Sequence, residues 1–217
     1  MPASVGYPST PAQLVRAAPF VLLCLVVSWL LMAITTKPDF GHESRLVFHI
    51  PDLTRDIQTG LSSVFTAPLI NRGPQQVIYV TLLLLIFGVL VESREGSLRA
   101  MFLFYTATAA GAFSAAIALH VVYPGFIDHP ALAEAWSSAW SGGSAAAFGF
   151  AGAFAARRQH AWRWLALFIL WETAVATLHL RNYTPAFHFS ALATGFLIAR
   201  YFLPERDAGA IRASSPA

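Results

Sequence analysis

The sequence predicts an all-α, polytopic membrane protein. Only 12% of its 217 residues are charged, whereas soluble domains average about 25%, and its mean hydropathy is +0.57. Six apolar runs approach the roughly 20 residues that a helix needs to cross a bilayer. They cover residues 17–35, 74–92, 100–122, 139–156, 163–180 and 185–203. We therefore expect an integral membrane protein with six transmembrane helices between residues 17 and 203.

The first run is predicted to be a membrane helix rather than a cleaved signal peptide. It is longer than the apolar core of a signal peptide, lacks a clear small-residue cleavage site and is preceded by a single charge, Arg16. It contains Cys24, the chain's one cysteine. A disulfide framework and a thiolate metal site within the chain are therefore excluded.

The segments outside the apolar runs form one long loop, short loops and two tails. Residues 37–73 carry prolines and charges between short apolar patches, which predicts a partly structured external loop. Helices that lie on the membrane surface would suit its composition. Residues 1–16 and 204–217 contain much Pro, Ser, Ala and Gly and are predicted to be flexible tails on the cytoplasmic side.

The arginines predict the orientation of the chain. Cytoplasmic loops are enriched in Lys and Arg, and here the arginines follow the second, fourth and last runs, as in Arg94, Arg99, Arg157 and Arg158, whereas residues 123–138 contain neither Lys nor Arg. Both termini are therefore predicted to be cytoplasmic. Because the arginines are dispersed and form no basic stripe, we expect the lipid bilayer, and no nucleic acid, as a partner.

The fourth run, "WSGGSAAAFGFAGAFAARR" at residues 140–158, is rich in small residues around Ser144. Two interpretations fit. Membrane helices pack closely through Gly, Ala and Ser, and a buried serine often only bonds a carbonyl one turn back. Alternatively, the close approach serves chemistry at the hydroxyl.

His188 lies near the start of the last run, beside a face formed by Ala191, Gly195 and Ala199 at a spacing of four. An ionisable residue within a membrane is a functional candidate, although an imidazole near the interface can simply bond a loop carbonyl. Ser144 and His188 are predicted at similar depth, about 5–8 Å along their helices. Packing of the two helices can then place the hydroxyl within reach of the imidazole, as an activated serine requires.

Three motifs in the same order make residues 55–203 similar to the rhomboid intramembrane serine proteases. They are "GGSAAAFG" around Ser144, "FHFSALATG" around His188 and "GVLVESREGSLR" between the second and third runs. The resemblance implies a serine endopeptidase that cleaves transmembrane segments of membrane-protein substrates. It also implies six spans with cytoplasmic termini, in a bacterial inner (plasma) membrane.

The resemblance implies that Ser144 is the nucleophile and His188 the general base of a Ser-His dyad. Phe148, one turn below Ser144, would pack against the imidazole. Gly143 and the Ser144 backbone N–H would support the oxyanion hole, and the amide of Gln76, or of its neighbour Gln75, could donate to it. No cofactor is expected, and no metal, because no His-x-x-x-His or His-Glu-x-x-His spacing occurs.

The sequence has Ser190 and Ala191 in place of two glycines of the family pattern, and two further departures bear on catalysis. The family carries His-x-x-x-Asn on its second helix, where this chain has Gln76 and Val80, and it has Gly where this chain has Ala145. Loss of one oxyanion donor lowers a rate by about 10²–10³. The alternative is therefore a catalytically inactive rhomboid-like protein that binds transmembrane helices and affects their folding or turnover.

Glu172 falls in the middle of the fifth run. A charged carboxylate is expensive there, so protonation or pairing is expected. The sequence gives no basis for a catalytic role.

Overall fold

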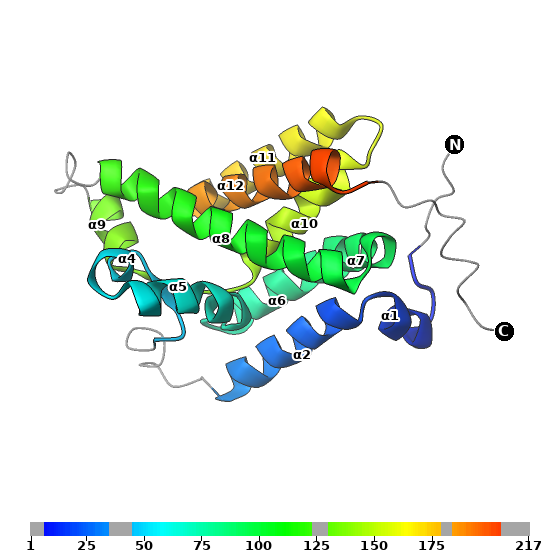
Figure 1. Ribbon diagram of the computed structural model, residues 1–217, viewed down its shortest axis with the longest axis horizontal. Helices are drawn as coiled ribbons and strands as arrows, with labels where there is room; N and C mark the ends of the chain where they lie inside the picture. Colours follow the sequence, from blue (N-terminus) through cyan, green and yellow to red (C-terminus); the bar gives the residue numbers. More distant parts are fainter. Residues whose placement is uncertain (1–6, 35–44, 123–129, 179–183, 205–217) are drawn as a thin grey trace.

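The computed structural model describes residues 7–34, 45–122, 130–178 and 184–204, and its helices gather around a central helix, α10 (Figure 1). In chain order the elements are α1 (Pro11–Ala17), α2 (Pro19–Ile34), β1 (Phe48–His49), α4 (Asp52–Arg55), α5 (Ile57–Thr66), η1 (Ala67–Leu69), α6 (Pro74–Leu83), η2 (Leu84–Gly88), α7 (Val89–Glu95), α8 (Ser97–Val122), α9 (Pro130–Ser137), β2 (Ala139–Trp140), α10 (Ser144–Ala156), α11 (Ala161–Leu178), α12 (Thr184–Leu197) and η4 (Ile198–Phe202).

The helices confirm an all-α polytopic membrane protein. Among the described residues, three helical segments are long and apolar enough to cross a membrane, namely Pro74–Glu95, Ser97–Val121 and Ala161–Leu178. A fourth follows if α1 and α2, which meet at a bend of 100°, count as one span. The first of the three runs through α6, the π-helical η2 and α7.

The prediction of a helix over residues 139–156 was wrong at its start. The helix α10 has only 13 residues and begins at Ser144, whereas Ala139 and Trp140 form β2, which pairs with β1 in antiparallel register. The reason is Gly142, whose φ of +102° is incompatible with a right-handed helix. Ser144 is therefore the first residue of its helix and not the fifth or sixth.

The N-terminal prediction also needs correction. Part of the segment 1–16, predicted to be a flexible tail, is helical: α1 begins at Pro11. Thr10 and Gln13 form a capping box, in which the Thr10 side chain accepts from the Gln13 N–H and the Gln13 side chain accepts from the Thr10 N–H. This local pattern stabilises a helix start.

The predicted external loop carries three short helical segments, α4, α5 and η1, over its described residues 45–73. In α5, Leu61 and Phe65 are exposed while Val64 is buried, which suits a helix at the membrane surface. Asp56 caps α5 by accepting from the Thr59 N–H. Hydrogen bonds from the Thr59 hydroxyl and N–H lower the pKa of the Asp56 carboxyl, because they stabilise its charged form.

Two buried glutamates hold the end of the bundle that lies opposite the start of α10. The carboxylate of Glu92 accepts the backbone N–H groups of Phe20 and Val21, each at 2.8 Å, and so satisfies the first turn of α2. Glu95 pairs with Arg157 at 3.1 Å, just beyond the end of α10. These contacts fix α2 and α10 relative to α7.

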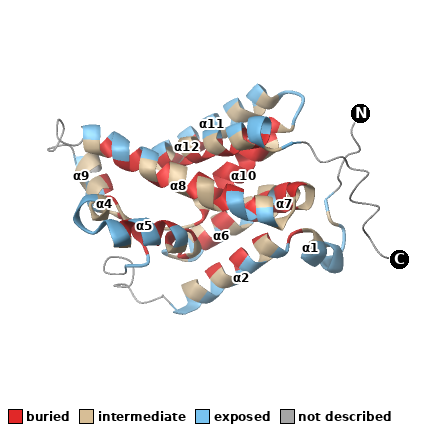
Figure 2. Cartoon of the chain, in the orientation of Figure 1, coloured by how far each residue is buried: buried red, intermediate tan, exposed pale blue. Residues whose placement is uncertain are grey.

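The centre of the protein is α10, which is buried along nearly all of its length (Figure 2). Its glycines allow α12 to approach until backbones touch. A Cβ at Gly152 would overlap the carbonyl of Leu192, and a Cβ at Gly195 would overlap the carbonyl of Gly149. The predicted small face of the last helix is confirmed, since Gly195 and its neighbours at spacing four are buried.

We predict that Gly195→Ala destabilises the protein. The added methyl group forces α12 away from α10, and overpacking of this kind costs about 1–3 kcal/mol. The apparent melting temperature of the detergent-solubilised protein should fall. The matched control is Ala193→Leu, a larger addition on an exposed position of the same helix; equal melting temperatures for the two variants would contradict the backbone contact.

Candidate active site

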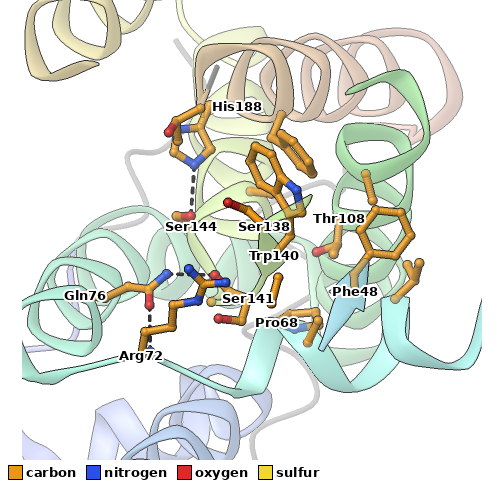
Figure 3. A pocket seen from close by; sticks show the side chains of 18 residues that line it. Phe48, Pro68, Arg72, Gln76, Thr108, Ser138, Trp140, Ser141, Ser144 and His188 are labelled. Atoms are coloured by element: carbon orange, nitrogen blue, oxygen red, sulfur yellow. Dashed lines mark hydrogen bonds between the residues drawn. The ribbon is translucent and has the colours of Figure 1, made fainter. Parts of the chain in front are cut away.

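The close packing of α10 and α12 brings Ser144 and His188 together (Figure 3). Ser144 is the first residue of α10 and His188 is the fifth residue of α12. The Ser144 Oγ lies 2.9 Å from the His188 Nε2, which is a hydrogen-bond distance. His188 is buried, with 5% of its surface exposed. The imidazole is thus held against the hydroxyl within the bundle.

A glycine turn positions Ser144 at the head of its helix. The N–H of Gly142 donates to the Ala67 carbonyl at 2.8 Å, and the carbonyl of Ser141 accepts from the Gln76 Nε2 at 2.7 Å. Gly142 has a positive φ, and a Cβ there would overlap the Gln76 amide. Both the backbone conformation and the space therefore require glycine at this position.

The start of α10 supplies backbone donors beside the hydroxyl. Gly143 is the N-cap residue, and no side chain caps the helix. The first hydrogen bond of the helix runs from the Ala147 N–H to the Gly143 carbonyl. The N–H groups that come before it, including that of Ser144, therefore have no acceptor within the helix. Such a terminus stabilises negative charge.

Phe148 lies flat against the imidazole. Its ring centroid is 4.4 Å from that of His188, and the two planes differ by 5°. Phe148 is itself buried in α10. The stacking restricts rotation of the imidazole about its side-chain bonds.

Glu172 of α11 is the neighbour that sequence reasoning missed. Its Oε1 lies 2.5 Å from the His188 Nδ1. The other ring nitrogen, Nε2, contacts the Ser144 hydroxyl. The carboxylate is 2% exposed. The available signal was a lone acidic residue in an otherwise apolar run, but its partner lies on another helix and could not be identified from spacing.

The three positions whose departures from the family pattern bear on catalysis differ in their surroundings. Val80 is fully buried, and its side chain would lie 3.1 Å from a Cβ at Gly143, so it packs beneath the turn without offering a donor. Gln76 lies in the pocket wall. Ala145 is the second residue of α10, where ordinary helical backbone accepts alanine.

A pocket opens onto Ser144 and His188 from the end of the bundle where β1 and β2 pair. One wall is the extended segment 138–142. Sequence reasoning did not identify the remaining lining, which is mostly apolar and includes Phe48, Val64, Thr108, Ala112 and Phe187. The Ser144 hydroxyl and the His188 imidazole both line this pocket.

The described residues contain no group of three or more His, Cys, Asp or Glu side chains that could hold a metal ion. Three histidines, His42, His129 and His179, lie outside the described residues.

Comparison with protein families matches the Rhomboid domain over residues 58–205, a range that includes Gln76, Ser144, Glu172 and His188. Comparisons with curated proteins and with solved structures found no match. The family match covers more than half of the chain and spans the elements that build the site. The chain belongs to the rhomboid family.

Proposed function

We propose that the chain is an intramembrane serine endopeptidase that cleaves transmembrane segments of membrane proteins. The observation that carries this proposal is the 2.9 Å contact between the Ser144 Oγ and the His188 Nε2. A nucleophile within hydrogen-bond reach of a base is the requirement for covalent acyl transfer. Family membership supports the same chemistry.

In the first step, His188 Nε2 takes the Ser144 proton while Oγ bonds to the substrate carbonyl carbon. The carbonyl oxygen becomes an oxyanion. The imidazolium then gives its proton to the leaving nitrogen as the carbon–nitrogen bond breaks, which leaves an acyl group on Ser144. Water attacks this ester with His188 as base, and the new carboxyl product leaves.

Donors at the head of α10 would stabilise the oxyanion. The Ser144 N–H belongs to a first turn without a side-chain cap, so it needs no rearrangement to donate. Gly143 keeps this turn compact, because a side chain there would meet the Pro68 carbonyl and Val80. Gln76 donates one amide hydrogen to Ser141, and we assign the second hydrogen of its Nε2 to the oxyanion.

The substrate would have to reach the pocket in an extended form. Backbone carbonyls within a membrane helix are hydrogen-bonded and shielded, so a segment that unwinds easily is required. The apolar lining of the pocket suits the side chains of such a segment.

The arginine pattern supports an orientation with both termini cytoplasmic, and the bacterial inner membrane is proposed from the family resemblance alone. Arg157 follows the end of α10 and Ser144 begins the helix, so the pocket would open at the outer side, where water is available for hydrolysis.

A fluorophosphonate probe should label the wild-type protein in detergent. Ser144 Oγ would bond to phosphorus with loss of fluoride, while His188 takes the proton. Labelling should be lost in Ser144→Ala and fall by at least about 100-fold in His188→Ala, the scale of general base catalysis. Gel fluorescence measures both.

Ser190→Ala is the matched control, because Ser190 lies on α12 and its hydroxyl donates to the Ala186 carbonyl of the same helix; its labelling should equal that of the wild type. If folded wild-type protein is not labelled, the better assignment is an inactive rhomboid-like protein that binds transmembrane helices.

Gln76→Ala should lower the rate constant of labelling by about 10²-fold, the cost of losing one oxyanion donor. The phosphonyl oxygen occupies the oxyanion position, so the rate reports this donor. Gln75→Ala, an exposed neighbour on α6, should label at the wild-type rate. Equal rates for the two variants would mean that Gln76 does not donate to the oxyanion.

A further inference from the structure

We infer that Glu172 is a positioning residue that completes a Ser144–His188–Glu172 triad, a step that rests on the proposed function. The three side chains form one continuous line of contacts. Ser144 Oγ meets His188 Nε2 at 2.9 Å, and His188 Nδ1 meets Glu172 Oε1 at 2.5 Å. Each side chain comes from a different helix, α10, α12 and α11.

The placement of Glu172 is specific. Helix α11 lies at the edge of the bundle, and its buried residues are Glu172 and Ala176, while neighbours such as Trp171 and Thr173 are exposed. The helix therefore turns its acidic side chain inward, toward α12, although burial of a carboxylate in a membrane span is expensive.

The imidazole is the compensation that the structure shows for this burial. The second carboxylate oxygen of Glu172, Oε2, is buried without a hydrogen-bond partner among the described residues. The bond from Oε1 to His188 Nδ1 is thus the direct polar contact of the group. A carboxylate whose main contact is the ring of a general base is suited to act through that ring.

The contact decides which imidazole nitrogen carries the proton. An ionised carboxylate accepts only, so with Glu172 ionised Nδ1 carries the hydrogen and donates it to Glu172. Nε2 is then left with its lone pair facing the Ser144 hydroxyl, the form that a general base needs. When Nε2 takes the serine proton, the negative charge of Glu172 stabilises the imidazolium that forms.

Two contacts therefore hold the ring in complementary ways. Phe148 stacks on the face of His188 and fixes the plane of the ring, while Glu172 bonds its edge and fixes rotation within that plane. The stacking cannot select a tautomer, because a phenyl ring bonds neither nitrogen. Glu172 supplies that selection.

The experiment compares phosphonylation kinetics of wild-type protein, Glu172→Gln and the control Thr173→Val. Thr173 is exposed and bonds the Ile169 carbonyl within α11. We expect Glu172→Gln to keep the probe's binding constant within threefold and to lower the maximal inactivation rate by at least about 100-fold. Exchange of the triad carboxylate for its amide lowers kcat by about 10⁴ in a soluble serine protease, because the wrong tautomer forms. Thr173→Val should match the wild type.

A second readout follows the tautomer directly. In protein labelled with ¹⁵N-histidine, the His188 signals are identified by their loss in His188→Ala. Wild type should show a protonated Nδ1 and an unprotonated Nε2, and Glu172→Gln should lose this pattern while retaining its melting temperature. A residue that only joins α11 to α12 would leave the catalytic rate and tautomer unchanged in the amide variant.

The outcomes separate this inference from the proposed function. If the wild type is labelled and Glu172→Gln reacts within threefold of its rate, Glu172 has no part in positioning. If the wild type is not labelled, the protease assignment fails, and the wild-type spectrum still tests Glu172: protonated Nδ1 supports the contact and protonated Nε2 overturns it. If Glu172→Gln fails to fold, the wild-type spectrum tests the contact in the same way.

Discussion

The direct backbone contact between α10 and α12 is the constraint on which the rest of the structure depends. Gly152 of α10 and Gly195 of α12 leave no room for a Cβ against the backbone of the other helix, so the two helices approach more closely than side chains would allow. This distance sets Ser144 against His188, which lie 44 positions apart in the sequence. The loop, α6 and α11 then contribute side chains around the Ser144–His188 contact that this pair of helices has already defined.

Three buried glutamates of this bundle each contact another polar group. Glu92 satisfies the first turn of α2, Glu95 pairs with Arg157, and Glu172 meets the imidazole of His188. In a medium with little water, each such group needs a partner within the protein. The first two contacts hold helices together, whereas the third adjoins a hydroxyl that faces a pocket.

Much of the fold could be predicted from the sequence, because the apolar runs and small-residue faces follow from simple periodicities. The motifs identified Ser144, His188 and Phe148, and in the structure both Ser144 and Phe148 contact the His188 ring. The start of α10 was misplaced, since an apolar run does not reveal that Gly142 adopts a positive φ. The pairing of β1 with β2 was also missed, because two-residue strands leave no detectable alternation.

By itself, the sequence determined that this chain enters a membrane as helices, and which of its helices approach closely, since length, hydropathy and residue size act locally. Only the tertiary structure decided what Glu172 and Gln76 contact. Both depend on the rotation of one helix relative to another, and that rotation is fixed by packing across the whole bundle. A carboxyl group in the middle of an apolar run is unfavourable when considered alone, whereas in the tertiary structure it has the His188 imidazole as its partner.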